Sequence, residues 1–234
     1  MKTFLQHAAL ICLTLHVCSP ANANLVINTT GSQRGSIGRF GESTSGTPAT
    51  FGQTFTVVAG ATVLDEFAFY VTENTALDEG FEFTFHVGRW NGFRVDGPLV
   101  FSSGPMTSTN NGGAGGSEEI RFQIGQELDV GDLYVAFVTS EGLFDGDTGT
   151  VSVPIAGTAP IFDPYTGGEF VYAQRFDNFN SLSTTTWLFD SNDNTTNFDT
   201  HFEAVFSAVP EPSSAIGLLL LCVAGLNSRR VRER

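Results

Sequence analysis

The chain has 234 residues, with 11 lysines and arginines against 25 aspartates and glutamates, which gives a formal net charge of -14. This acidic balance excludes nucleic acid as a partner, because phosphate contacts need clustered cations. Apolar residues make up 41% of the chain and include 22 phenylalanines, so the composition is that of a globular protein with a substantial core.

The N-terminus predicts a secretory signal peptide over residues 1–23. Lys2 gives a short cationic start, an apolar stretch follows from Ala8 to Val17, and small residues stand at Ala21 and Ala23. This order is typical of a signal peptide that is cleaved after Ala23. A buried first helix is the alternative, but no capping or amphipathic pattern supports it.

Residues 24–208 form the predicted body of the protein. This segment holds six arginines, no lysine and 23 acidic residues, so its formal charge is -17. The three cysteines, Cys12, Cys18 and Cys222, all lie outside it. The body therefore has no disulfide, no thiol nucleophile and no cysteine metal ligand. A chain of this length can bury about 70% of its surface, so it needs no covalent cross-link.

Alternation of apolar and polar residues dominates the body and predicts strands, while helical periodicity is scarcely seen. Phe81, Phe83, Phe85 and Val87 alternate with more polar residues, and the same period recurs further along the chain. The predicted strands are 51–58, 62–72, 81–87, 99–102, 120–124, 133–137, 150–154, 169–174, 186–190 and 201–207.

Polar, glycine-rich turns separate these strands, as in the stretches 96–98 and 110–113. About ten short strands without crossover helices predict an all-β fold, an antiparallel β-sandwich of jelly-roll type. The stretch from Gly52 to Tyr70 also resembles the opening of sandwich domains in exported bacterial proteins, some of which bind carbohydrate.

The body shows no catalytic motif. It has neither a Gly-x-Ser-x-Gly elbow nor a His-Glu-x-x-His helix, and its two histidines, His86 and His201, are expected to be solvent-facing strand residues. We therefore expect a protein that is not an enzyme. A glycan hydrolase with two carboxylates remains an alternative, because 23 acidic residues offer many pairs.

Two acidic loops are candidate calcium sites, since hard oxygen donors cluster there and export places the body where calcium is abundant. The first loop holds Asp145 and Asp147, and the second holds Asp190 and Asp193. Ordinary solvated turns are the alternative for both. No other cofactor is expected.

Glycan binding would use aromatic platforms beside hydrogen-bonding groups. Trp90, Tyr165 and Trp187 are the candidates, with a core or rim position as the alternative for each. The strong negative charge disfavours acidic polysaccharides unless cations bridge them.

The C-terminal segment, residues 209–234, has three consecutive parts. Pro210, Glu211 and Pro212 come first, an apolar run from Ala215 to Leu226 follows, and arginines crowd the last six positions. The 16 residues from Ser213 to Ser228 would form a helix of roughly 24 Å, which is short for a bilayer core of about 30 Å but usable with local thinning. The arginines would stay cytoplasmic, which places the body outside the inner membrane.

This three-part order resembles the PEP-CTERM sorting domain of Gram-negative bacteria. The resemblance implies that an exosortase, a membrane protease, recognises Pro210, Glu211 and Pro212, with Arg229 and Arg230 as the basic stop. It also implies a link to exopolysaccharide production. An ordinary tail anchor without processing is the alternative.

Together, the two ends predict an exported protein that is delivered to the cell envelope or extracellular matrix. Its expected partners are the secretion machinery, an exosortase, the inner membrane for a limited time, and extracellular polysaccharide. A carbohydrate-binding module is the first alternative function and glycan hydrolysis the second.

Overall fold

Two antiparallel sheets make up the body, which the computed structural model describes over residues 24–40, 48–73, 82–109, 116–143, 151–156, 163–174, 179–189 and 198–209. The first sheet contains β1 (Leu25–Asn28), β2 (Gln33–Phe40), β4 (Val63–Glu73), β8 (Gly116–Glu127), β10 (Val151–Ala156), β13 (Asp199–Thr200) and β14 (Phe202–Ser207). The second sheet contains β3 (Pro48–Thr56), β5 (Glu82–Trp90), β6 (Val95–Ser102), β7 (Met106–Thr107), β9 (Leu133–Thr139), β11 (Phe170–Gln174) and β12 (Leu188–Phe189).

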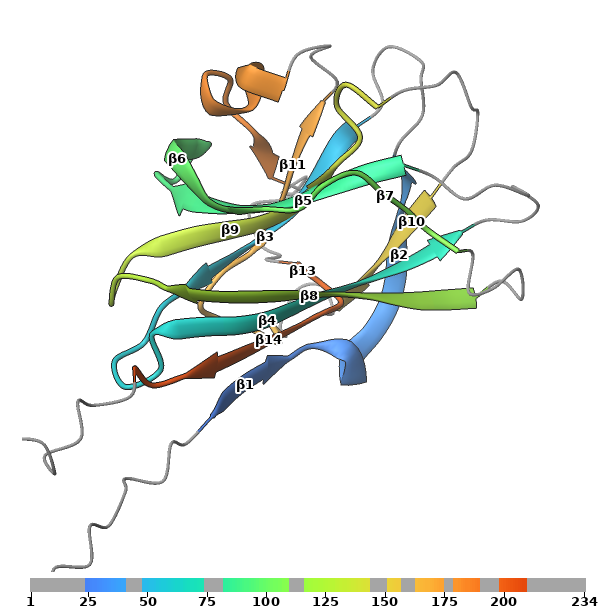
Figure 1. The fold of residues 1–234 in the computed structure, drawn as a ribbon. Coiled ribbons are helices and arrows are strands. Elements are labelled where there is room, and N and C mark those ends of the chain that lie inside the picture. Colours follow the sequence, from blue (N-terminus) through green and yellow to red (C-terminus); the bar gives the residue numbers. More distant parts are fainter. Residues whose placement is uncertain are drawn as a thin grey trace, which may run out of the picture. The chain divides into compact units, whose positions relative to one another are not determined.

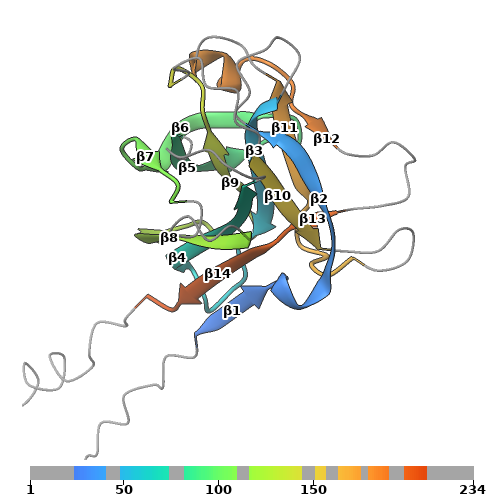
Figure 2. The ribbon, with the colours of Figure 1, turned by 90° about the vertical axis from the view of Figure 1, so that its right-hand side faces the viewer.

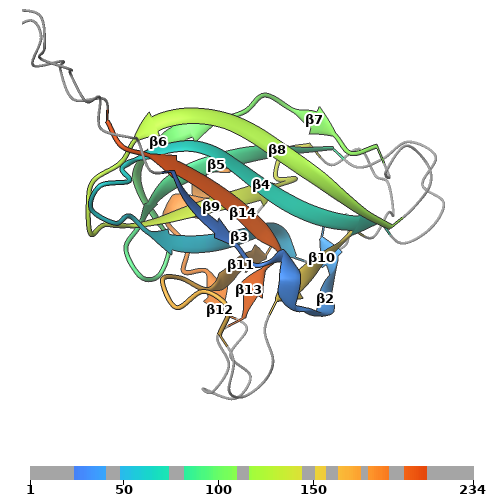
Figure 3. The same cartoon turned by 90° about the horizontal axis from the view of Figure 1, so that it is seen from below.

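In the first sheet, β4 lies between β14 and β8, and β1 pairs with the far edge of β14 (Figure 3). At the end of β4, β10 pairs with Thr72 and Glu73, and β10 in turn pairs with β2 and β13. In the second sheet, the order is β12, β11, β3, β9, β5 and β6, with β7 paired to the start of β5. Two short 3-10 helices, η2 (Thr30–Ser32) and η4 (Phe179–Ser183), complete the described elements.

Phenylalanine rings fill the space between the two sheets, which Figures 1 and 2 show as separate layers. Phe85 of the second sheet stacks on Phe122 of the first, with ring centroids 3.9 Å apart and an interplanar angle of 9°. Phe55 and Phe206 meet edge to face across the same space at 5.8 Å. Such aromatic pairs add to the hydrophobic effect of burial, so this layer joins the sheets.

A second apolar cluster covers the outer face of the second sheet. In β9, Tyr134, Ala136 and Val138 face the inter-sheet core, whereas Val135 and Phe137 belong to the outer cluster. Both faces of β9 are thus buried, which explains its nearly continuous apolar sequence. The 3-10 helix η4 closes this cluster from outside through Leu182.

The prediction of an all-β antiparallel body is confirmed, and each of the ten predicted strands overlaps an observed one. Four strands were missed, namely β1, β2, β7 and β13. β1, β7 and β13 are very short, and the glycines in β2 interrupt any alternation. The part of the chain that the structure describes contains no helix long and apolar enough to cross a membrane.

Candidate functional site

Most of the sequence-predicted site residues lie outside the described part of the chain. These are the cleavage residues Ala21 and Ala23, the calcium candidates Asp145, Asp147, Asp190 and Asp193, and the sorting residues Pro210, Glu211, Pro212, Arg229 and Arg230. Among the described residues, no group of three or more histidine, cysteine, aspartate or glutamate side chains is arranged to hold a metal ion.

The two tryptophans proposed as glycan platforms are buried in the outer cluster of the second sheet. Trp90 is 6% exposed and Trp187 is 1% exposed, and their rings meet edge to face at 5.3 Å. The indole nitrogen of Trp187 donates a hydrogen bond to the carbonyl of Leu182 at 2.8 Å. Neither ring offers an open face, so both tryptophans occupy the core position that the sequence analysis set against a platform role.

Tyr165, the third platform candidate, is half-buried and lies against Phe202, with ring centroids 5.6 Å apart. Its hydroxyl oxygen accepts a hydrogen bond from the backbone N–H of Thr56 at 3.2 Å. The residue therefore holds the segment before β11 against the end of β3. Tyr165 thus occupies the rim position that the sequence analysis considered, whereas the two tryptophans are buried.

Both histidines are buried, which corrects the expectation that they face solvent. His86 lies under Phe179 of η4, and its ring nitrogens are 2.9 Å from Ser102 Oγ and 2.8 Å from Thr84 Oγ1. Burial lowers the pKa of His86 to about 4, so the ring is neutral at physiological pH. Burial also lowers the pKa of His201, whose ring lies edge-on to Tyr70.

A hollow of about 190 Å³ opens beside η4 on the outer face of the second sheet. Polar and apolar groups line it in comparable amounts, and the polar ones include an amide and a hydroxyl. The main lining residues are Val95, Leu99, Phe137, Leu182, Phe179, Asn180 and Ser183. Gly97 also lines it, and a side chain added at this glycine would meet nothing within 4 Å. The hollow is smaller than a pocket for a drug-sized ligand, and it suits a single ring.

A pair of carboxyl groups, the buried Asp199 and the half-buried Asp163, joins β13 to the segment that precedes β11. Asp199 is fully buried, and its two carboxyl oxygens accept hydrogen bonds from Gln53 Nε2 at 2.7 Å and from the Tyr165 backbone N–H at 3.0 Å. The same N–H also lies 3.0 Å from Asp163 Oδ1. The two carboxyl groups therefore share one donor, and nothing in the sequence indicates this pairing.

Burial raises the pKa of Asp199 to about 8, and the nearby charge of Asp163 adds to the shift, while the hydrogen bond from Gln53 opposes it. Asp199 is thus mainly protonated at neutral pH. Burial also raises the pKa of Glu169 on the same segment, with Asp163 again contributing. Because Asp199 has no exposed surface, it cannot meet a substrate as an acid or base. Its hydrogen bonds instead hold β13 against β3 and the segment before β11.

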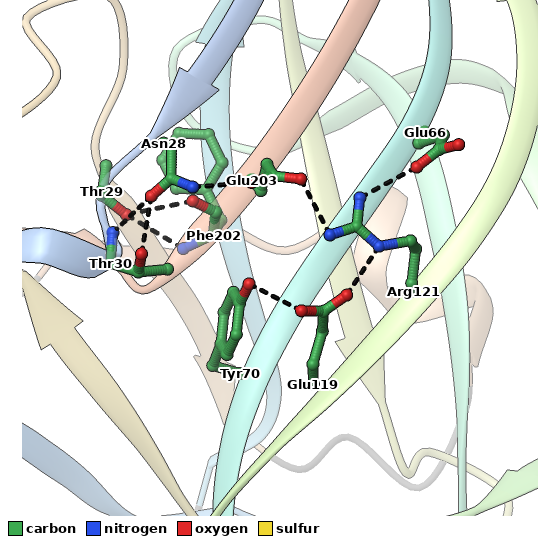
Figure 4. A network of polar contacts seen from close by, with 9 residues as sticks. All are labelled: Asn28, Thr29, Thr30, Glu66, Tyr70, Glu119, Arg121, Phe202 and Glu203. Atoms are coloured by element: carbon green, nitrogen blue, oxygen red, sulfur yellow. Dashed lines mark hydrogen bonds and ion pairs between the residues drawn. The ribbon is translucent and has the colours of Figure 1, made fainter.

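A polar network covers the outer face of the first sheet (Figure 4). Arg121 of β8 contacts Glu66 of β4 at 2.9 Å, Glu119 of β8 at 2.6 Å and Glu203 of β14 at 2.8 Å. Tyr70 donates a hydrogen bond to Glu119 at 2.9 Å, and Asn28 of β1 donates one to Glu203 at 2.6 Å.

The hydrogen bond from Arg121 is the main cause that lowers the pKa of Glu119, and the hydrogen bonds to Glu119 and Glu203 raise the pKa of Arg121. The guanidinium and the Glu119 carboxylate therefore stay ionised at neutral pH. Since each of the three carboxylates around Arg121 is already paired, the network ties four strands together and offers no free nucleophile or base.

No family model matches the chain, and no curated protein matches it. Among solved structures, the chain is similar to the clostridial cysteine protease Cwp84 after propeptide cleavage, with 9% identity and a TM-score of 0.50 over 80% of this chain and 40% of that one. A second structure holds the cysteine protease and lectin-like domains of Cwp84, a surface layer associated protein of Clostridium difficile. It gives 10% identity and a TM-score of 0.43 over 68% of this chain and 32% of that one. The chain thus spans less than half the length of either structure, and the first likeness shows a shared fold alone.

Proposed function

We propose that the chain is an exported, non-enzymatic protein of the cell surface or extracellular matrix that an exosortase-type protease processes. The observation that carries this proposal is the order of its C-terminal segment: Pro210, Glu211 and Pro212, then an apolar run, then arginines that include Arg229 and Arg230. The signal peptide over residues 1–23 gives the same orientation independently. Both segments, and the jelly-roll connectivity, remain predictions.

The described body is compatible with such processing. Its last strand, β14, ends at Ser207, three residues before Pro210. Proteases act on extended substrate, and Pro210 and Pro212 disfavour helix around Glu211. Cleavage at this motif would therefore remove the membrane segment without cutting a strand of either sheet.

Fractionation of the native cells tests this proposal. A tagged chain should reach the surface or medium, whereas the variant Glu211→Ala should accumulate as a longer form in the inner-membrane fraction, because the protease would no longer recognise it. The matched control is Glu233→Ala, which removes one carboxylate of the same tail outside the motif. An unprocessed wild-type chain in the membrane fraction would contradict the proposal.

A carbohydrate-binding module is the second candidate function, and the hollow beside η4 favours it. A sugar ring binds where an apolar surface lies next to hydrogen-bonding groups, and Phe179, Asn180 and Ser183 supply both at the edge of the hollow. This places the candidate glycan site away from Trp90 and Trp187, whose rings are covered.

Binding of exopolysaccharide fragments to immobilised protein tests the second candidate. The variant Ser183→Ala combined with Phe179→Leu should weaken binding at least tenfold while the thermal unfolding midpoint changes little. Phe93→Ala, on an exposed turn of the same sheet, is the control and should bind like the wild type. Equal binding by all three proteins would remove the hollow from consideration.

A further inference from the structure

Four exposed valines gather at one end of the sandwich. Val58 lies in the turn between β3 and β4, Val130 in the turn between β8 and β9, Val209 just after β14, and Val26 in β1. Their exposed fractions are 46%, 55%, 41% and 53%, respectively. They are four of the seven large apolar side chains that are exposed in the described ranges. We call this surface the valine end.

Backbone hydrogen bonds hold the two turns of the valine end side by side. The N–H of Val57 donates to the carbonyl of Asp132 at 3.2 Å, and the N–H of Gly131 donates to the carbonyl of Val57 at 2.9 Å. Just behind the tips, the N–H of Leu128 donates to the carbonyl of Thr62 at 2.8 Å. The valines at the two tips are therefore fixed on neighbouring loops.

Both ends of the body leave the fold at this surface. In the first sheet, Ser207, the last residue of β14, pairs with Val63, the first residue of β4. Leu25, the first residue of β1, pairs with Phe206. Figure 1 shows the start of β1 and the end of β14 next to each other at this end. The strand that continues into the sorting segment thus ends beside the two turns.

The valine end carries little net charge, although the body is strongly acidic. The turn Val58-Ala59-Gly60-Ala61 has no ionisable side chain. Asp129 and Asp132 flank Val130, but Arg89 forms ion pairs with both of them, which leaves a formal charge of about -1 for the three side chains. The acidic charge on the rest of the body would be repelled by the phosphates of lipid headgroups. The valine end would be repelled much less.

The chain between the body and the predicted membrane segment is short. Seven residues, 208–214, separate the end of β14 at Ser207 from the apolar run that begins at Ala215. Fully extended, they span at most about 25 Å. A short tether gives the surface next to its attachment point a high effective concentration at the bilayer, so weak apolar contacts suffice there.

We infer that the valine end is a membrane-contacting surface that rests at the polar–apolar boundary of a phospholipid bilayer while the chain is still anchored. This inference rests on the proposed function, since it needs residues 210–234 in the membrane. The valines would enter the boundary by about 5–10 Å, as apolar groups of interfacial proteins do. Removal of the anchor would release the valine end from the bilayer, because the contacts of four valines are too few to hold the body there without the tether.

Fluorescence quenching by lipid tests the inference on the full chain. The chain is reconstituted in phosphatidylcholine vesicles whose acyl chains carry bromine, a quencher of tryptophan, and the variants Val130→Trp and Val58→Trp are compared with Met106→Trp. Met106 is 37% exposed and lies in β7, which pairs with the start of β5 at the opposite end. The wild type corrects for Trp90 and Trp187, which are buried.

We expect both valine-end variants to be quenched at least about twofold more than Met106→Trp, because only groups within the boundary meet the bromines. The difference should persist at high salt, since the contact is apolar. Equal quenching at all three positions in chains that float with the vesicles would overturn the inference and leave the proposed function intact. A blue-shifted emission without quenching would also overturn it, since protein would then cover the surface. Chains that do not float with the vesicles would contradict the proposed function itself.

Discussion

Replacing Asp199 by asparagine should change how the stability of the protein depends on pH. In the folded protein, burial raises the pKa of Asp199 from 3.8 to about 8. The folded state therefore binds this proton more tightly than the unfolded state between about pH 4 and pH 8, so stability falls as the pH rises through that window. A pKa shift of this size lowers the free energy of unfolding by at most about 5 kcal/mol between pH 4 and pH 8.

The Asp199→Asn variant would carry a neutral side chain at every pH. The carbonyl of the new amide can accept the hydrogen bond from Gln53, and the Tyr165 N–H retains Asp163 Oδ1 as an acceptor at 3.0 Å. Because only the unfolded wild type gains by ionising, the variant should be more stable than the wild type by about 1–2 kcal/mol at pH 5 and by about 5 kcal/mol at pH 8.5.

Urea unfolding followed by tryptophan fluorescence from pH 5 to pH 9 measures this difference. Trp187 is almost fully buried and reports the loss of packing. The control is Asp96→Asn, an exposed carboxylate in β6. If the unfolding free energies of Asp199→Asn and the wild type run parallel over this range, the buried protonated carboxyl is refuted.

Three further predictions concern packing and the buried histidine. Gly52→Ala should destabilise the protein by about 1–3 kcal/mol in urea unfolding, since the new methyl group would lie 2.8 Å from a methyl carbon of Val135. Phe122→Ala should cost about 3–5 kcal/mol in the same assay, because it removes the ring that stacks on Phe85. For His86, whose pKa is lowered to about 4, the unfolded state binds the extra proton between pH 4 and pH 6.5, so stability should fall as the pH drops through that window. An NMR titration that shows His86 charged at pH 6 would contradict this assignment.

The strands could be predicted from the sequence because local alternation encodes them. Phe83 and Phe85 face the inter-sheet core from β5, and Ile120, Phe122 and Ile124 do so from β8, as the period of two requires. β2 gave no such signal, since its sequence alternates no apolar residues and depends on pairing with β10.

The burial of His86 could not be predicted, and the sequence could not decide between a core position and a platform for Trp90 and Trp187, because local alternation does not show when the outer face of a sheet is covered. The segment that covers this face is η4, which lies more than 90 residues after His86 in the chain. The hydrogen bonds around Asp199 could not be predicted from the sequence either, since Gln53 lies 146 residues before it. Sequence patterns report which face of a strand is apolar, and only the tertiary fold shows what lies against it.

The export proposal is tested most directly by the intact mass of the protein isolated from native cells. We expect a mature form that begins at Asn24 and ends near the motif Pro210-Glu211-Pro212, without the apolar run and the arginines that follow. A mature form that keeps Arg229 and Arg230 would contradict processing by an exosortase-type protease.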